Sequence, residues 1–190
     1  MAKDGNKNKT ILYADYSERN IRAANSAITP LGFGKFVQCD DRERTVELVQ
    51  ELKPDLVMIG LYLDGMRGIS TIRAIRDSAT DSSPFGREVP VILGAPKLDR
   101  RAMRDAVDAG IEGVFRQPVD PKRLCKIVET VIQKPRRFVL EDNYFGPARP
   151  QDLAKMGIAA SEDEDNTEDA QENDQAPGRR KSDQIKTAAG

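Results

Sequence analysis

Short runs of consecutive apolar residues alternate along the chain with stretches in which apolar residues recur every three or four positions. Consecutive apolar residues are typical of strands buried on both faces, and the wider spacing is typical of helices with one buried face. Five such strand–helix pairs follow one another between residues 9 and 133. The pattern predicts strands at 11–14, 35–39, 56–59, 91–93 and 113–115.

Polar residues ahead of the helical repeats predict where helices begin. Ser17 is a suitable N-cap, Asp40 and Glu43 have the spacing of a capping box, and Asp120 precedes Pro121 at the first helical position. Buried strands with helices between them imply a parallel sheet that is covered on both faces and joined by right-handed crossovers. The chain is therefore predicted to contain a doubly wound, five-stranded α/β domain.

Composition changes near residue 134 and sets the predicted domain organisation. Residues 1–133 carry 21 Lys and Arg against 19 Asp and Glu, whereas residues 161–174 (SEDEDNTEDAQEND) contain eight acids and no basic residue. A segment so poor in apolar residues buries too little surface to offset its chain entropy. We predict a disordered N-terminus at 1–8, a domain at 9–133 and an extension at 134–190 that is mostly disordered.

The residue inventory excludes several kinds of chemistry. The chain of 190 residues has no His, which rules out His-based acid–base catalysis, His metal ligands and phosphohistidine. Cys39 and Cys125 are too few for a disulfide framework and are expected to be reduced, buried thiols. No apolar run reaches the ~18–20 residues of a membrane span, and the N-terminus is polar. A cytoplasmic protein without a membrane span is expected.

Three segments resemble the bacterial response-regulator receiver domain, the CheY-like family. Residues 106–118 (AVDAGIEGVFRQP) are similar to its A-x-x-A-G-A-x-x-Y-x-x-K-P segment, 53–59 (KPDLVMI) to its third strand, and 65–68 (GMRG) to its G-M-D-G turn. The resemblance covers roughly residues 10–133. It implies the flavodoxin-like strand order 2-1-3-4-5, with the functional site at the C-terminal ends of the strands.

The resemblance also implies a phosphorylation site, from which this sequence departs. In the family, two acids after the first strand and an Asp ending the third hold Mg²⁺, and that third-strand Asp accepts a phosphoryl group. A Thr or Ser after the fourth strand and a Lys after the fifth bind the phosphoryl oxygens. Asp15 matches the first acid, and the other matching positions hold Tyr16, Gly60, Ala95 and Gln117. The expectation is a degenerate pseudo-receiver that is not an enzyme and binds no metal or other cofactor.

The altered positions are interpreted structurally. Asp15 is expected to cap the first helix and bind a neighbouring backbone N–H; a remnant of the metal site is the alternative. The ring of Tyr16 is expected to fill vacated space; the alternative is that it gates the old pocket or binds a ligand. Gly60 and Gly94 both end buried strands, so the pocket floor is expected to be unusually open. An open pocket leaves a small-molecule ligand as an alternative.

Two segments are candidate partner-binding surfaces. The first is a basic face which, by the resemblance, is the output surface of the family; its residues are Arg100, Arg101, Arg104, Val114, Arg116, Lys122, Arg123 and Lys126. The alternative for these charges is an ordinary solvated helix face. The second is the aromatic stretch of the extension with Tyr144, Phe145 and Arg149, which either packs back on the domain or is captured by a partner. The acidic run at 161–174 is a spacer or a mask over the arginines.

The sequence predicts a phosphorylation-independent adaptor that binds signalling proteins, such as kinase, motor, chemotaxis or regulatory components, in bacterial two-component or chemotaxis-type signalling. A sensor that binds a nucleotide or another anion through the Arg clusters or the altered pocket is the alternative. A receiver phosphorylated on a non-standard acid, for which Asp64 is the nearby candidate, is a third. DNA binding is not expected, because the net charge is −1 and no helix-turn-helix signature is present. A weak homodimer is left open.

Overall fold

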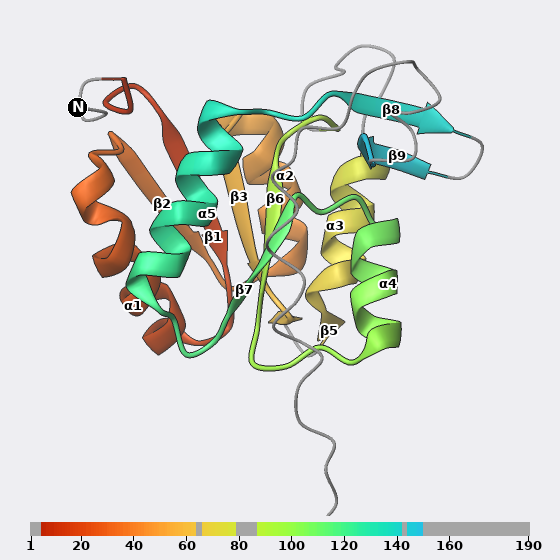
Figure 1. The fold of residues 1–190 in the computed structure, drawn as a ribbon, viewed down its shortest axis with the longest axis horizontal. Coiled ribbons are helices and arrows are strands. Elements are labelled where there is room, and N and C mark those ends of the chain that lie inside the picture. The colour runs from red at the N-terminus through yellow and green to blue at the C-terminus, as the bar shows by residue number, and fades with distance from the viewer. Residues whose placement is uncertain (1–4, 64–65, 79–86, 142–143, 150–190) are drawn as a thin grey trace, which may run out of the picture. The chain divides into compact units, whose positions relative to one another are not determined.

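A computed structural model describes residues 5–63, 66–78, 87–141 and 144–149 (Figure 1). Parallel strands form a five-stranded sheet in the order β2 (Lys35–Cys39), β1 (Thr10–Ala14), β3 (Leu56–Gly60), β6 (Val91–Ala95) and β7 (Gly113–Arg116). Numbered along the chain among themselves, these strands stand in the order 2-1-3-4-5. The predicted fold class and strand order are confirmed.

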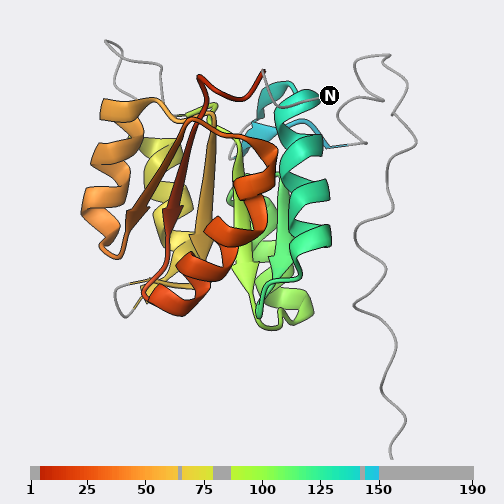
Figure 2. The same ribbon diagram turned by 90° about the vertical axis from the view of Figure 1, so that its left-hand side faces the viewer.

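Helices cover both faces of the sheet. The helices α1 (Glu18–Ile28) and α5 (Pro121–Gln133) pack on one face, and α2 (Arg42–Leu52), α3 (Gly68–Asp77) and α4 (Arg100–Asp108) pack on the other (Figures 1 and 2). A short 3₁₀ helix, η1 (Thr29–Leu31), follows α1, and the short strands β4 (Tyr62–Leu63) and β5 (Met66–Arg67) pair after β3. Among the described residues, none of the helices has the length and apolar character needed to cross a bilayer.

Side-chain caps start the helices at or near the predicted residues. The Ser17 hydroxyl accepts from the Asn20 N–H at 3.4 Å, and Asp120 caps α5 just before Pro121, as predicted. The capping-box prediction for Asp40 is wrong by one residue. Asp41 is the N-cap of α2, because its carboxylate reaches the Arg44 N–H at 2.6 Å, the third helical position.

The N-terminal residues differ in part from the prediction. Residues 5–8 form a turn, although the whole of 1–8 was predicted to be disordered. Asn6 is 8% exposed, its side-chain amide donates to the Leu31 carbonyl at 3.0 Å, and its own carbonyl accepts from Lys9 and Gly34. These long-range hydrogen bonds order the turn, which no local pattern reveals. Residues 1–4 lie outside the described part of the chain.

The predicted extension contains a structured hairpin. The strands β8 (Phe138–Glu141) and β9 (Tyr144–Pro147) pair antiparallel and pack near the residues that precede β6 and β7. Arginine guanidinium groups lie over three of its rings. Arg87 lies 4.2 Å from the Phe145 ring centroid, Arg149 lies 3.9 Å from that of Tyr144, and the third arginine lies over Phe138. Packing back on the domain, one of the two alternatives for these aromatics, is therefore what the structure shows. The acidic run at 161–174 lies outside the described residues.

The third of these arginines, Arg76, connects the hairpin with the residues that precede β6 and β7. Its guanidinium lies 5.0 Å from the Phe138 ring and donates to the carbonyls of Arg87, Val89 and Gly110 at 2.7–2.8 Å. Burial of this side chain, which is 4% exposed, lowers the pKa of Arg76 to about 10. The group therefore keeps its charge at neutral pH and joins the end of α3 to the residues that lead into β6 and β7.

Replacing Arg76 should destabilise the fold strongly. Arg76→Met leaves three carbonyls without their donor, and at about 1 kcal/mol for each lost hydrogen bond we expect a loss of about 3 kcal/mol in the free energy of unfolding. Urea denaturation followed by circular dichroism measures this. Arg73→Met is the matched control, because Arg73 is exposed on the same helix, and it should change stability by less than about 0.5 kcal/mol. Equal stabilities of the two variants would contradict the role of Arg76.

Candidate functional site

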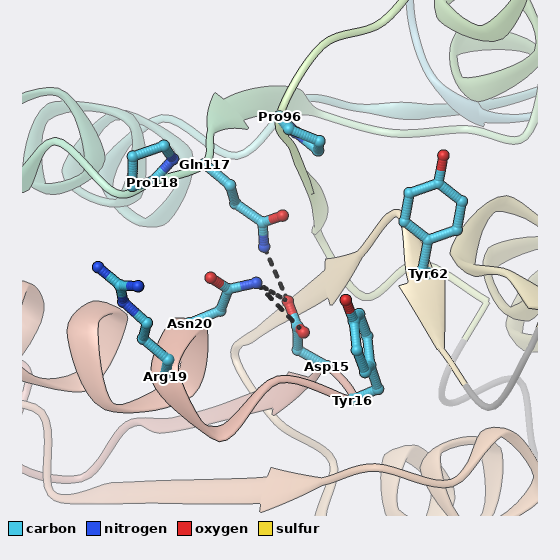
Figure 3. Close-up of a pocket in the computed structure, with 8 residues that line it drawn as sticks. All are labelled: Asp15, Tyr16, Arg19, Asn20, Tyr62, Pro96, Gln117 and Pro118. Atoms are coloured by element: carbon cyan, nitrogen blue, oxygen red, sulfur yellow. Dashed lines mark hydrogen bonds between the residues drawn. The ribbon is translucent and has the colours of Figure 1, made fainter.

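The C-terminal ends of four parallel strands bring the predicted site residues together. Asp15 follows β1, Gly60 ends β3, Ala95 ends β6 and Gln117 follows β7. Because these strands are neighbours in the order β1-β3-β6-β7, the four positions meet at one edge of the sheet. Figure 3 shows the side chains of Asp15 and Gln117 pointing toward each other across this edge.

The carboxylate of Asp15 is the centre of the site. It is 1% exposed and accepts the Tyr13 hydroxyl and the Gln117 amide at Oδ2, both at 2.8 Å. Its Oδ1 accepts the Ser17 backbone N–H at 2.8 Å, and the Asn20 amide lies 3.2 and 3.4 Å from the two oxygens. A buried charge is costly unless it is hydrogen-bonded. Here the donors are neutral groups, and the contact with Ser17 is the structural role expected for Asp15.

The Tyr13 hydroxyl is held in its protonated form. Burial, and after it the adjacent charge of Asp15, raise the pKa of Tyr13 well above its usual value. The Gln117 amide also donates to the Tyr13 oxygen at 3.0 Å. Tyr13, Asp15 and Gln117 therefore form a closed triangle of hydrogen bonds that joins β1 to the residue after β7.

The floor of the site is filled, so the expectation of an open floor is wrong. A Cβ placed on Gly60 would overlap the Asp15 carboxylate and lie 2.7 Å from its Cγ. A Cβ on Gly94 would overlap the Phe115 ring and lie 3.0 Å from the Gln117 amide nitrogen. The glycines leave no void, because neighbouring side chains already occupy the space above them.

Tyr16 does not fill vacated space, and this expectation is also wrong. Its side chain is 65% exposed and, with Tyr62 at 54%, stands at the mouth of the site. The Gln117 amide and the Asp15 carboxylate are hydrogen-bonded inside, and the ring of Tyr16 lies outside this pair. A cavity of about 360 Å³ opens between these elements (Figure 3), lined by Asp15, Tyr16, Arg19, Asn20, Tyr62, Pro96, Gln117 and Pro118.

Several of the lining residues were not predicted from the sequence. Asn20 lies one turn into α1, and its position three residues after the N-cap Ser17 was the one available signal that it faces the strand ends. Arg19 precedes it, and Tyr62 comes from the short strand β4. Pro96 and Pro118 directly follow residues that were predicted, Ala95 and Gln117, but neither proline suggests chemistry by itself.

The predicted partner-binding residues lie elsewhere in the fold. The basic side chains are exposed and lie on α4, at the end of β7 and on α5; they are Arg100, Arg101, Arg104, Arg116, Lys122, Arg123 and Lys126. Val114 on β7 is half-buried against the core under α4. Tyr144, Phe145 and Arg149 belong to the hairpin region, where Arg149 also contacts Asp108 at 3.1 Å. The edge strand β7 lies between α4 and α5, which cover opposite faces of the sheet (Figure 1).

The residues present do not fit a divalent metal ion. Mg²⁺ takes oxygen ligands, and a carboxylate that binds it turns its lone pairs to the ion. Both oxygens of Asp15 instead face N–H and O–H donors, whose hydrogens would point at an ion placed there. Within the described ranges, no group of three or more Cys, Asp or Glu side chains is arranged to hold a metal.

Comparisons with known proteins identify the family of the domain. Residues 11–129 match the response regulator receiver domain family. The DNA-binding response regulator MtrA of Mycobacterium tuberculosis is 30% identical over 94 residues, which cover 50% of this chain and 38% of MtrA. The transcriptional regulatory protein BaeR of Escherichia coli is 22% identical over 129 residues, or 67% of this chain and 47% of BaeR. The chain thus spans less than half the length of these curated relatives.

Solved structures share the fold. A putative response regulator from Chloroflexus aurantiacus superposes with a TM-score of 0.59 at 16% identity, covering 67% of this chain and 99% of that one. The chemotaxis protein CheY4 of Vibrio cholerae gives 0.58 at 15% identity, covering 65% and 98%. The receiver domain of the sensor histidine kinase PA1611 from Pseudomonas aeruginosa, solved with a magnesium ion in its active-site cleft, gives 0.58 at 20% identity, covering 67% and 99%.

A side chain at position 60 should disrupt the site. Gly60→Ala forces a methyl group into the hydrogen-bonded carboxylate of Asp15, and we expect a loss of about 2 kcal/mol in the free energy of unfolding, typical of overpacking. Gly113→Ala is the matched control, because a Cβ there meets only Ile127 at 3.8 Å, an ordinary contact. Thermal and urea unfolding of both variants measure the difference. A Gly60→Ala protein as stable as Gly113→Ala would show that the carboxylate is not fixed.

Proposed function

The chain belongs to the response regulator receiver domain family, and we propose that it is a receiver that works without phosphorylation. In this proposal it is a non-enzymatic adaptor that binds partner proteins in two-component or chemotaxis-type signalling. The observation that carries the proposal is that the carboxylate of Asp15 occupies the space above Gly60, where a third-strand side chain would extend.

The phosphoacceptor position offers no nucleophile. Gly60 has no side chain, and the space into which a third-strand carboxylate would extend is occupied by the carboxylate of Asp15. Gln117 is neutral and directs its N–H groups to Asp15 and Tyr13. Ala95 at the end of β6 has no hydroxyl to bind a phosphoryl oxygen. Of these replacements, Gln117 takes part in the internal hydrogen-bond network, Gly60 leaves room for the carboxylate of Asp15, and Ala95 lacks the hydroxyl.

Loss of the phosphoryl group changes how the protein is controlled. A ligand shifts a conformational equilibrium only by binding one state better than another. Without a phosphoryl group, no phosphorylation signal at this site shifts the output face, which in this proposal keeps one conformation. Control then comes from the concentration of the partner or from other parts of the chain.

The basic face around β7 is the surface we assign to partners. Exposed arginines begin α4, and lysine and arginine follow on α5, on either side of the edge strand. A positive surface speeds encounter with acidic partners in a salt-dependent way. The partners we propose are signalling proteins, such as kinases or chemotaxis components, that present acidic side chains.

The anion-sensor alternative has less support at the altered pocket. Among the residues that line the cavity, Arg19 is the single cation, and Asp15 contributes a negative charge at the floor. A phosphate placed there would face a carboxylate rather than a cluster of donors. The non-standard phosphoacceptor alternative rested on Asp64, which lies outside the described residues.

Phosphorylation is tested directly by mass. Incubation of the full chain with acetyl phosphate and Mg²⁺ should leave its mass unchanged, because Gly60 provides no carboxylate and Asp15 is saturated by donors. Intact mass spectrometry checks this, with a receiver that retains its acidic cluster in the same tube as the positive control. A hydroxylamine-labile adduct of about 80 Da, the mass of one phosphoryl group, would overturn the proposal.

Charge reversal tests the partner surface. The double variant Arg101→Glu and Arg104→Glu should capture partner proteins several-fold less well than wild type, with a nearly unchanged melting temperature, because both side chains are exposed. Arg22→Glu with Lys35→Glu is the matched control, since these exposed cations lie on α1 and β2. Quantitative affinity capture at low and high salt measures the effect. If the α4 variant binds as well as the control, the surface assignment fails and the segment 144–149 becomes the leading candidate.

A further inference from the structure

The cavity beside Asp15 presents hydrogen-bond acceptors to the outside. The Gln117 amide nitrogen donates its two hydrogens to Tyr13 and Asp15, and the Asn20 amide nitrogen lies within hydrogen-bonding distance of both oxygens of Asp15. An amide oxygen in either place would face a carboxylate, so Asp15 itself fixes the orientation of both amides. The groups left to face the cavity are the two amide oxygens. Figure 3 shows that of Gln117 turned away from Asp15, on the side of Pro96 and Tyr62.

The Gln117 amide oxygen is an acceptor that faces the cavity. Gln117 is 9% exposed, and its amide oxygen accepts no hydrogen bond from any residue that the structure describes. The oxygen lines the open cavity, so a ligand that covers it must supply a donor to keep it hydrogen-bonded. A ligand that reaches this oxygen must therefore carry an N–H or O–H group.

Two exposed tyrosines stand over the same cavity. Tyr16 and Tyr62 are 65% and 54% exposed, yet both line the cavity that contains the polar floor. The face of an aromatic ring carries negative charge density and attracts cations, planar guanidinium groups in particular. In Figure 3 both rings lie on the other side of Asp15 from Arg19, the cation at the rim. Among the lining residues that the structure describes, the one cation therefore lies on the far side of Asp15 from the tyrosines.

We infer that this cavity receives the guanidinium group of an arginine side chain presented by a partner protein. The group is planar, so it stacks on a tyrosine ring, and it donates hydrogen bonds to the amide oxygen of Gln117. The carboxylate of Asp15 behind the amides adds attraction for the positive charge. The inference rests on the proposed function only for the source of the arginine; the chemistry of the cavity stands apart from it.

Other ligand chemistries fit less well. A phosphate would bring acceptors to a floor of acceptors beside a carboxylate. A magnesium ion would need the Asp15 oxygens that the neutral donors already occupy. A lysine ammonium would reach the same oxygen, but it is compact and strongly hydrated and lacks the planar face that stacks on a ring.

Binding is tested with short peptides on the isotope-labelled full chain. The probes are acetylated, amidated peptides that differ at one residue: arginine, lysine or citrulline, the last a neutral group with nearly the shape of arginine. We expect the arginine peptide to shift the NMR signals of the Gln117 and Asn20 side-chain amides, the citrulline and lysine peptides to bind more weakly, and inorganic phosphate and Mg²⁺ to leave these signals in place. Equal binding of the citrulline and arginine peptides, the same shifts with phosphate, or no shift with arginine would each overturn the inference.

Variants at the rim separate this site from an anion site. Tyr62→Ala should weaken the arginine peptide about fivefold, as expected for the loss of one cation–π contact, and Tyr62→Phe should retain the affinity. Arg19→Ala should strengthen binding of the arginine peptide, because it removes a like charge, whereas an anion site would be weakened by the same change. Both residues are exposed, so the fold should tolerate these changes. Weaker arginine-peptide binding by Arg19→Ala would overturn the assignment.

Failure of this inference can be told apart from failure of the adaptor proposal. The double variant Arg101→Glu and Arg104→Glu should bind the arginine peptide as wild type does, because neither residue lines the cavity. Partner capture without peptide binding would reject the guanidinium site and keep the adaptor. Peptide binding without any captured partner would reject the adaptor and keep the site.

Discussion

The buried carboxylate of Asp15 is the constraint on which the rest of the site depends. A carboxylate that is 1% exposed must be surrounded by donors, and here every donor is a neutral N–H or O–H group. This requirement fixes the protonation of Tyr13 and the orientation of the Gln117 amide. It also ties the start of α1 to the strand end through the Ser17 backbone. Neutral donors within the protein compensate the charge of Asp15 here, where the family uses a metal ion.

The residues that depart from the receiver pattern are mutually consistent. Asp15 occupies the space above Gly60, and Phe115 and Gln117 occupy the space above Gly94. A side chain restored at position 60 would meet a carboxylate already committed to other partners. A positive charge restored at position 117 would replace an amide that donates to two oxygens at once. Gly60 and Gln117 therefore act together, because the first makes room for the carboxylate of Asp15 and the second supplies it with a donor.

Local patterns predicted the fold well because strands and helices depend on nearby residues. The five parallel strands, their order and the caps at Ser17 and Asp120 followed from apolar spacing, cap chemistry and the family resemblance. The hairpin was not predicted as structure, because arginines far away in the sequence stabilise its rings. The site positions were found by resemblance, but the outward ring of Tyr16 and the filled floor were not. They depend on donors from three separate elements meeting at one carboxylate.

Both ends of the sheet edge that carries the basic face are tied down. Where β6 and β7 begin, the buried guanidinium of Arg76 holds the carbonyls of Val89 and Gly110. Where β7 ends, Gln117 is bonded to Asp15 and Tyr13 of β1. An element fixed at both ends has little freedom to adopt a second arrangement, and a switch needs two arrangements of comparable free energy. This geometry favours the proposed receiver that works without phosphorylation, in which the output face keeps one arrangement and specificity comes from the charge and shape of the partner.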